Sequence, residues 1–517
     1  MSASLAGTRL LAGALALATA LLSACAGGDS GSAQDDNTLT MMVPLFKTAP
    51  DPQGEVQQAV EKYLGTKLKI NWVPNAEYGD KTNVVLASDD FPEAMVIQDN
   101  KSPSFVKAAE AGAFWDLTGK LDKYPNLKPA SEQTARNASV NGKTYGIYRV
   151  RPELRSAVLI RKDWLDKLGL KLPESTDDLY NIAKAFTEKD PDGDGKKDTY
   201  GLIIPKWPTT VFAASSPYNA IDVWFGAPNN WGERNGKLVP EFDTPEFMEA
   251  NRYIKKMIDE GLVNPDWATL DTAKWDDPFV QGKGGIIIDV NVRASQLYSE
   301  LKAVDPGHYT EKVAMTGNLK RSDGQKFSLP FTGYNGIIAI SKQSVPTEEK
   351  LAKVLTVLDK LASKEAGILL TNGIEGRNFK VEDGYAVPIN QDDPKVKVIE
   401  NDIDYGFVQL GTKYTVGLGA YPAKPPSEAE QENLRLRDEL MKLDLQTAVN
   451  DPSLPVISPT LVAKGATLNP IVYDARLKYL AGQMTEGQLK AEIKRWYDSG
   501  GTQVAAEIND LVSKIGG

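Results

Sequence analysis

Aspartates recur at every second position at the start of residues 190–198, and this spacing is typical of a calcium-binding loop. Gly195 allows the sharp turn by which hard oxygen ligands converge. Without a cation these carboxylates would repel one another. Gly201 replaces the glutamate that usually ends such a loop, and a solvated turn is the alternative. We therefore predict one structural calcium held by Asp190, Asp192, Asp194, the carbonyl of Lys196, and Asp198.

Six aromatic residues lie between Trp207 and Trp231 among Ser, Asn, Gly and Pro. They follow neither a helical nor an alternating pattern, so we expect a long loop, and long loops are usually functional. Aromatic faces stack on the apolar faces of sugars, although such rings also pack under loops. We predict that Trp224 and Trp231, and with less support Trp207, are stacking platforms for a carbohydrate.

Polar side chains follow the predicted strands at their carboxyl ends, where α/β sheets place ligand groups. Two arginines lie near the point where the chain is expected to leave the first half of the fold, Arg149 and Arg151. Arginine recognises carboxylates but also donates to neutral hydroxyls, so an acidic sugar is one interpretation. The predicted polar ligand contacts are Gln98, Asp99, Tyr148, Arg151, Asp289, Tyr334, Asn335 and Arg377.

Short apolar runs alternate with helical patterns from Thr38 onward, which indicates an α/β fold with mainly parallel sheets. The helix expected after Thr244 is the best marked, with Pro245 in its first turn and Gly261 at its end. If the chain leaves one lobe near 150 and returns near 333, two or more segments cross between lobes and form a hinge over a cleft.

The N-terminus has one charge before a short apolar run, Leu10 to Leu22, as in a secretory signal peptide. Leu22-Ser23-Ala24-Cys25 resembles the bacterial lipobox, which implies that Cys25 carries the lipid. A soluble form cut before Cys25 is the alternative. Residues 26–37 then read as a flexible tether. No later segment approaches 18 uninterrupted apolar residues, so we expect membrane attachment through the lipid alone.

The composition narrows the classes of function. The chain has 517 residues, a net charge of −10 and a single cysteine. The acidic balance argues against a nucleic-acid partner, and one cysteine excludes internal disulfides. His308 is the only histidine, and no GxSxG, HExxH or phosphate loop occurs. We therefore expect a binding protein and no enzyme.

Four segments carry a family resemblance together with the lipobox and the calcium loop. They are residues 84–97, 141–147, 159–170 and 373–379. The chain resembles extracellular solute-binding proteins of family 1, the sugar-binding lipoproteins of ABC importers. That resemblance implies a two-lobed, type II periplasmic-binding-protein-like fold with a hinge of multiple crossovers and a helical C-terminal region. It also implies an oligosaccharide ligand and ABC permease subunits as partners of a monomer on the extracytoplasmic face of the membrane.

The expected organisation has a signal peptide over 1–24 and a lipidated tether over 25–37. Lobe 1 is predicted to comprise 38–150 and about 333–405, and lobe 2 to comprise 151–332 and about 406–517 with the C-terminal helices. A calcium-dependent glycoside hydrolase or lyase remains an alternative, because paired carboxylates are common in the sequence. A structural surface protein or adhesin is another. The sugar's identity, charge, length and linkage, its affinity, the transporter and the lobe boundaries do not follow from the sequence.

Overall fold

The computed structural model describes residues 37–46, 48–88, 90–207, 216–413 and 421–516. The predicted signal peptide and Cys25 lie outside these residues. Among the helices described, none combines the length and the apolar character that a membrane crossing requires.

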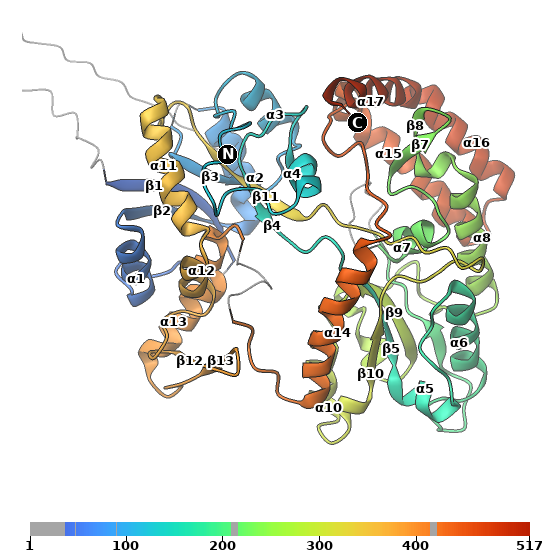
Figure 1. Cartoon of the computed structure of the whole chain (residues 1–517). Coiled ribbons are helices and arrows are strands. Elements are labelled where there is room, and N and C mark those ends of the chain that lie inside the picture. The colour runs from blue at the N-terminus through green and yellow to red at the C-terminus, as the bar shows by residue number, and fades with distance from the viewer. Residues whose placement is uncertain (1–36, 47, 89, 208–215, 414–420, 517) are drawn as a thin grey trace, which may run out of the picture. The chain divides into compact units, whose positions relative to one another are not determined.

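One mixed sheet is built from strands that lie far apart in the sequence, and Figure 1 shows blue strands beside a yellow one. Its order is β2-β1-β3-β11-β4. β1 and β3 are parallel, with Met41 opposite Ala94, whereas β11 is antiparallel to both of its neighbours. The strands are β1 (Thr38–Leu45), β2 (Lys67–Pro74), β3 (Ala94–Ile97), β4 (Ile147–Val150) and β11 (Tyr334–Ile340).

Helices pack on this sheet through apolar residues at helical spacing. In α1, Val56, Val60 and Leu64 are buried, and the helix ends at Gly65, whose positive φ suits glycine. The helices of this part are α1 (Glu55–Leu64), α2 (Asn75–Leu86), α3 (Pro103–Glu110), α4 (Glu132–Ala138), α11 (Glu348–Leu361), α12 (Lys364–Thr371) and α13 (Pro394–Tyr405). A small hairpin of β12 (Phe379–Glu382) and β13 (Tyr385–Pro388) lies between α12 and α13 in the chain. Phe407 and Leu410 also pack in this core.

A second mixed sheet has the order β10-β5-β9-β6. β9 is antiparallel to β5 and parallel to β6. The expectation of mainly parallel sheets is therefore wrong, because in each sheet a central strand arrives from a direction opposite to its neighbours. The strands are β5 (Ser156–Arg161), β6 (Tyr200–Leu202), β9 (Gly284–Val290) and β10 (Val313–Thr316), and β7 (Trp231–Arg234) pairs with β8 (Lys237–Pro240) in a separate hairpin.

Side-chain caps begin two helices of the second part, and the cap at Thr244 was predicted. Thr244 accepts a hydrogen bond from the amide of Phe247, and Ser175 forms a capping box with Asp178. These helices are α5 (Lys162–Leu168), α6 (Thr176–Glu188), α7 (Pro217–Trp224), α8 (Pro245–Asp259), α9 (Asp277–Val280) and α10 (Arg293–Val304). The C-terminal region is helical, as predicted, with α14 (Glu428–Leu445), α15 (Pro459–Leu480), α16 (Glu486–Trp496) and α17 (Thr502–Ile515).

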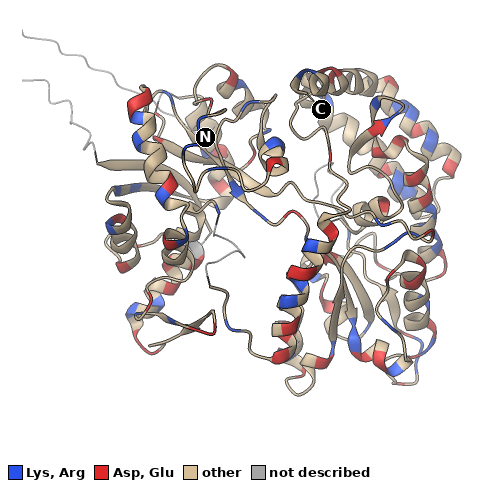
Figure 2. Ribbon diagram, in the orientation of Figure 1, with Lys and Arg blue, Asp and Glu red and all other residues tan. Residues whose placement is uncertain are grey.

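The chain passes between the two sheets more than once. It leaves the first sheet after β4, returns from β10 to β11, and leaves again between α13 and α14. This is the two-lobed periplasmic-binding-protein-like fold with multiple crossovers. The lobe boundaries stated above stay a prediction. Acidic and basic residues are interspersed along helix α14 of the C-terminal region (Figure 2).

Candidate functional site

Predicted ligand contacts follow β3 at its carboxyl end. Gln98 and Asp99 are exposed, and the side-chain amide of Gln98 donates a hydrogen bond to Asn75 Oδ1 at 2.8 Å. Asn100, directly after them, is buried and donates to the carbonyl of Ala138. These two exposed side chains are accessible to a ligand, while Asn100 fixes the loop against the end of α4.

The start of β11 lies beside this loop. The hydroxyl of Tyr334 donates to Asn100 Oδ1 at 3.0 Å, although the two residues are 234 positions apart. Asn335 is exposed, and the register shifts between Tyr334 and Ile337. Gly336 has a φ of +74°, and a Cβ there would lie 2.5 Å from the carbonyl oxygen of Ile97. The structure therefore brings the predicted contacts of β3 and β11 together, and it does so through a bulge that needs glycine.

Three arginines lie at the first crossing between the lobes, Arg149 in β4 and Arg151 and Arg155 in the segment that follows it. Burial lowers the pKa of Arg149 and that of Arg151 to about 10, and it also lowers the pKa of Arg155. No carboxylate of the described residues forms an ion pair with any of them. Arg149 donates to the carbonyl of Asn335 and to Gln409, and Arg151 donates to the carbonyl of Val150.

Arg155 is the least satisfied of the three. Its guanidinium lies 4.4 Å from the ring centre of Phe331 and makes no hydrogen bond with any residue that the structure describes, and its Nε is buried. The neighbouring charge of Asp289 acts on it only at longer range. We did not predict Arg155, although its spacing from Arg149 and Arg151 in a single crossing segment was the available signal.

Asp289, predicted as a ligand contact, is 6% exposed and accepts a hydrogen bond from Arg293 Nε at 2.5 Å. The same arginine donates to Asp276 at 2.5 Å and lies over the ring of Trp275. Burial raises the pKa of Asp289 in spite of Arg293. Because its charge is already paired inside the second lobe, Asp289 more readily explains how β9 is joined to α10 than how a ligand is held.

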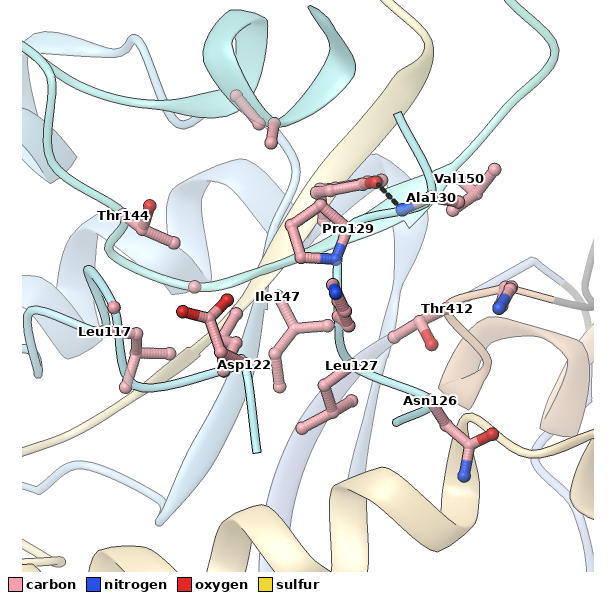
Figure 3. Close-up of a pocket in the computed structure, with 18 residues that line it drawn as sticks. Leu117, Asp122, Asn126, Leu127, Pro129, Ala130, Thr144, Ile147, Val150 and Thr412 are labelled. Carbon is pink, nitrogen blue, oxygen red and sulfur yellow. Dashed lines mark hydrogen bonds between the residues drawn. The ribbon is translucent and has the colours of Figure 1, made fainter. Parts of the chain in front are cut away.

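Tyr148 lines a pocket of about 90 Å³ on the outer edge of β4 (Figure 3). Its hydroxyl accepts a hydrogen bond from the amide of Ala130 at 3.0 Å. Pro129, Thr144 and Thr412 contribute to the same wall. Tyr148 is thus half-buried, with its hydroxyl holding the segment before α4, and it remains a candidate contact of this small pocket.

The long aromatic loop is a wrong prediction. Pro217–Trp224 is helix α7, begun by Ser216, and Trp224 is fully buried with its indole donating to Asn318 at 2.8 Å. Trp231, in β7, is 7% exposed and packs in the same core. An enclosed ring has no face for a sugar, so the structure corrects both stacking assignments. Trp207 is half-buried and meets Trp275 edge to face, with centroids 5.6 Å apart; residues 208–215 lie outside the described residues.

Arg377 is also engaged within the protein. Its guanidinium pairs with Glu55 through contacts of 3.0 and 3.1 Å and with Asp393 at 2.7 Å. The hydrogen bonds that Arg377 donates to these carboxylates, first to Glu55 and then to Asp393, raise its pKa further. Both partners lie in the first lobe, so Arg377 ties α1 to the start of α13, and its contact with a ligand stays a prediction.

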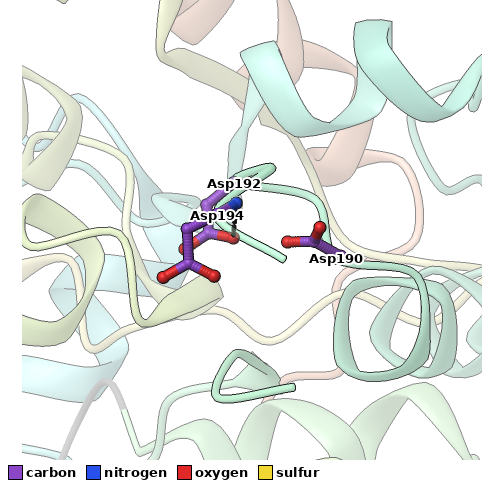
Figure 4. Close-up of side chains that lie close together, drawn as sticks. All are labelled: Asp190, Asp192 and Asp194. Atoms are coloured by element: carbon purple, nitrogen blue, oxygen red, sulfur yellow. Dashed lines mark hydrogen bonds between the residues drawn. The ribbon is translucent and has the colours of Figure 1, made fainter. Parts of the chain in front are cut away.

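The predicted calcium loop brings three carboxylates together (Figure 4). One oxygen from each of Asp190, Asp192 and Asp194 lies within 4.8 Å of the others. The amides of Gly193 and Gly195 donate to Asp190 at 3.0 and 3.1 Å, which holds the turn. Burial, together with the hydrogen bond to Asp190, raises the pKa of Asp192.

Lysines surround these carboxylates. Lys196 pairs with Asp194 at 3.0 Å, Lys167 donates to the carbonyl of Asp190, and Lys283 pairs with Asp198 at 2.6 Å. Asp198 therefore stands apart from the three clustered carboxylates in this structure. The hard oxygen ligands around this glycine turn nevertheless fit Ca²⁺. A cation between them would offset the repulsion of the crowded carboxylates.

The chain matches a known protein family and is similar to two proteins of Bacillus subtilis over nearly its whole length. Residues 49–368 match the model of the family described as bacterial extracellular solute-binding protein. Lipoprotein LipO of Bacillus subtilis is 39% identical over 96% of this chain and 97% of its own length. The polygalacturonan/rhamnogalacturonan-binding protein YtcQ of the same organism is 33% identical over 95% of each chain.

Solved structures agree in fold. An extracellular solute-binding protein from Bifidobacterium longum subsp. infantis has a TM-score of 0.69 at 18% identity, covering 92% of this chain and 98% of its own. An EF-hand mutant of FusA from S. pneumoniae, in complex with fructo-nystose, has a TM-score of 0.61 at 17% identity, with coverages of 92% and 99%. The alginate-binding protein AlgQ2 without calcium ion has a TM-score of 0.60 at 19% identity, covering 92% of this chain and 98% of its own.

The family, YtcQ and the solved structures are described as binding proteins, in agreement with the prediction that the chain is no enzyme. The family match covers more than half of the chain, and two relatives match nearly all of it. The chain therefore belongs to the bacterial extracellular solute-binding proteins.

Proposed function

We propose that this protein captures an acidic oligosaccharide, of the oligo-uronide class, and delivers it to the permease of an ABC importer. Lobe closure around the bound sugar is the step that the fold supports, because a ligand that contacts both lobes favours the closed form. The mature protein is held at the extracytoplasmic face of the membrane by a lipid on Cys25.

The arginines of the first crossing carry this proposal. Arg151 and Arg155 are half-buried cations with which no carboxylate of the described residues forms an ion pair, and Asp289 acts on Arg155 only at longer range. Desolvated cations are costly unless an anion pairs with them, and arginine binds a carboxylate through two parallel hydrogen bonds. A uronic acid brings such a carboxylate on each sugar ring. Gln98, Asp99 and Asn335, which are exposed at the ends of β3 and β11, would then serve the sugar hydroxyls.

Two of the compared proteins support the acidic class. YtcQ binds polygalacturonan and rhamnogalacturonan by its name, and AlgQ2 binds alginate. All three polymers contain uronic acids. FusA, by contrast, was solved with a neutral fructan oligosaccharide, so a neutral oligosaccharide is the second candidate. The alternative of a glycoside hydrolase or lyase finds no support in the family or in these relatives.

The test compares oligogalacturonates with carboxyl-reduced oligomers of the same length by isothermal titration calorimetry. We expect the wild type to bind the acidic oligomer at least tenfold more tightly. Arg155→Gln and Arg151→Gln should remove most of that preference, since each loses a charge-assisted pair worth about 1.5–3 kcal/mol. Arg435→Gln is the matched control, because Arg435 is exposed on α14 and pairs with Glu432. Equal affinity for the acidic and reduced oligomers would reject the acidic class, and cleavage of either would reject the binding function.

The calcium and the lipid are further parts of the proposal. The carboxylates of Asp190, Asp192 and Asp194 would hold a structural Ca²⁺, with the carbonyl of Lys196 and Asp198 as predicted additional ligands. In support, an EF-hand is named for FusA, and the AlgQ2 structure is described as being without calcium ion. For the lipid, expression of the full chain in a bacterium fed with labelled palmitate should label the wild type. Cys25→Ser should abolish the label and release the protein into the medium. A labelled Cys25→Ser variant would contradict this attachment site.

A further inference from the structure

Phe331 lies between β10 and β11, in the segment where the chain crosses back to the first lobe. Its side chain is 7% exposed. The centre of its ring lies 4.4 Å from the guanidinium carbon of Arg155, which belongs to the first crossing. An aromatic face attracts a guanidinium that lies over it. The two crossings are therefore joined by a side-chain contact to one of the arginines that we propose as ligand contacts.

Main-chain hydrogen bonds fix both partners of this contact. The amide of Phe331 donates to the carbonyl of Glu153 at 2.7 Å, so the two crossing segments lie side by side. The carbonyl of Arg155 accepts a hydrogen bond from the amide of Asn291, directly after β9, also at 2.7 Å. Because the main chain is held on both sides, the ring is a firm support for the guanidinium.

Two carboxylates near Arg155 are engaged by other residues. Glu153, two positions before it, accepts a hydrogen bond through Oε1 from the hydroxyl of Thr134 in α4. Asp289 is paired inside the second lobe and acts on Arg155 without a hydrogen bond. The Nε of Arg155 is buried and makes no hydrogen bond with any described residue. The guanidinium thus has donors left for an anion, because a ring covers its face and leaves the donors in its plane.

We propose that Phe331 is a positioning residue for the recognition of an acidic sugar. Its ring holds the guanidinium of Arg155 in one orientation, so that a uronate carboxylate can meet the donors through two parallel hydrogen bonds. An arginine that is already held loses less side-chain freedom when the anion binds. This inference rests on the proposed function, because Phe331 acts through Arg155. It assigns to Phe331 the preference for a charged sugar and not the affinity for sugars in general.

Calorimetric titration of Phe331→Leu with an oligogalacturonate and with its carboxyl-reduced counterpart tests this role. Leucine keeps an apolar side chain but offers no ring face. We expect the variant to bind the acidic oligomer at least about fivefold more weakly than the wild type does, and the reduced oligomer with nearly unchanged affinity. Phe331→Tyr, which restores a ring face, should keep the wild-type preference. Phe242→Leu is the matched control, because Phe242 is 8% exposed and its ring meets Trp496 instead of an arginine.

A double variant separates positioning from packing. In the Arg155→Gln background, Phe331→Leu should cause no further loss of the acidic preference, since the ring acts through this arginine. An additional loss in that background overturns the proposal. So does an equal loss of affinity for the two oligomers in Phe331→Leu alone, because the ring then serves only the packing of the crossing.

A crystal structure of the wild type with an oligogalacturonate gives an independent measurement if Phe331→Leu fails to fold. A sugar carboxylate bonded to Arg155, with the guanidinium still on the ring of Phe331, supports the proposal. A carboxylate bound elsewhere, or a guanidinium that has left the ring, overturns it. If the wild type binds both oligomers equally, the proposed acidic class itself fails. If the wild type prefers the acidic oligomer and Phe331→Leu does so to the same degree, only this inference fails.

Discussion

Arg476 of α15 donates two hydrogen bonds, each of 2.8 Å, to the two carboxylate oxygens of Asp222 in α7. The arginine is 3% exposed and the aspartate is fully buried. A parallel pair of charge-assisted bonds is the strongest geometry open to these groups, but removing one partner leaves the other charged and buried. We therefore expect the packing of α15 on α7 to require both members of the pair.

Replacing one member of this pair should be costly. Arg476→Met is expected to lower the free energy of unfolding by about 3–5 kcal/mol, because Asp222 loses its counter-charge in the core. The double variant Asp222→Leu with Arg476→Met should recover most of that loss. Urea unfolding followed by tryptophan fluorescence measures both, with Arg495→Met on the exposed side of α16 as the control. A single variant as stable as the wild type would show that the pair contributes little.

Asp402 should make the first lobe less stable at neutral pH. Burial raises its pKa to about 6, and its Oδ2 has no hydrogen-bond partner among the described residues. A carboxyl whose folded pKa is raised binds more protons in the folded state, so stability falls as pH rises from about 4 to 6. Asp402→Asn is therefore expected to raise Tm at pH 7.5 and to change it little at pH 4. The same gain at both pH values would contradict the assignment.

The pKa of Glu507 is shifted in the opposite direction to that of Asp402, so its effect on stability has the opposite pH dependence. Burial acts to raise its pKa, but hydrogen bonds from Ser458 and Thr460 outweigh it and lower the pKa of Glu507 to about 2. A depressed pKa contributes stability that is present above about 4.5 and lost as pH falls toward 2. We expect Glu507→Gln to cost about 1–2 kcal/mol at pH 7 and almost nothing at pH 2.5, after allowance for partial exposure. Denaturant unfolding at the two pH values distinguishes this from a pH-independent packing loss.

Calcium removal should destabilise the second lobe. A chelator is expected to lower the Tm of the wild type by several degrees, because crowded carboxylates lose the cation that offsets their repulsion. In Asp192→Asn with Asp194→Asn, the chelator should have no effect. Asp383→Asn, in the exposed turn of the β12–β13 hairpin, is the control and should respond as the wild type does. If chelation leaves the wild-type Tm unchanged, the loop is only a solvated turn.

Sequence patterns correctly predicted the features that depend on residues close together in the chain. Thr244, Pro245 and the buried stripe of α8 were readable because caps and helical spacing act within a few residues. The clustering of Asp190, Asp192 and Asp194 could be predicted for the same reason, and the calcium itself stays a prediction. Helix α7 was missed because its aromatic residues were interpreted as ligand contacts, although Ser216 followed by Pro217 is a common helix start.

Ion pairs between residues that lie far apart in the chain could not be predicted from the sequence. Arg377 was predicted to meet a ligand, but it meets Glu55, which lies 322 positions away. The same holds for Asp222 and Arg476, 254 positions apart. Charge and residue type indicate that an arginine needs an anion. They do not indicate whether the protein or its ligand supplies that anion: the protein does so for Arg377, and we propose that the ligand does so for Arg155.

The apolar core around β5 and β9 contains residues from Val158 to Val512. Its last members are contributed by α17, whose final residue is Ile515. This half of the molecule consequently cannot complete its core before α17 has packed against it, so its folding depends on contacts between residues that lie far apart in the sequence. Truncations that remove α17 should therefore yield aggregated chains rather than a smaller working protein, and purification tags are better placed after that helix than in exchange for it.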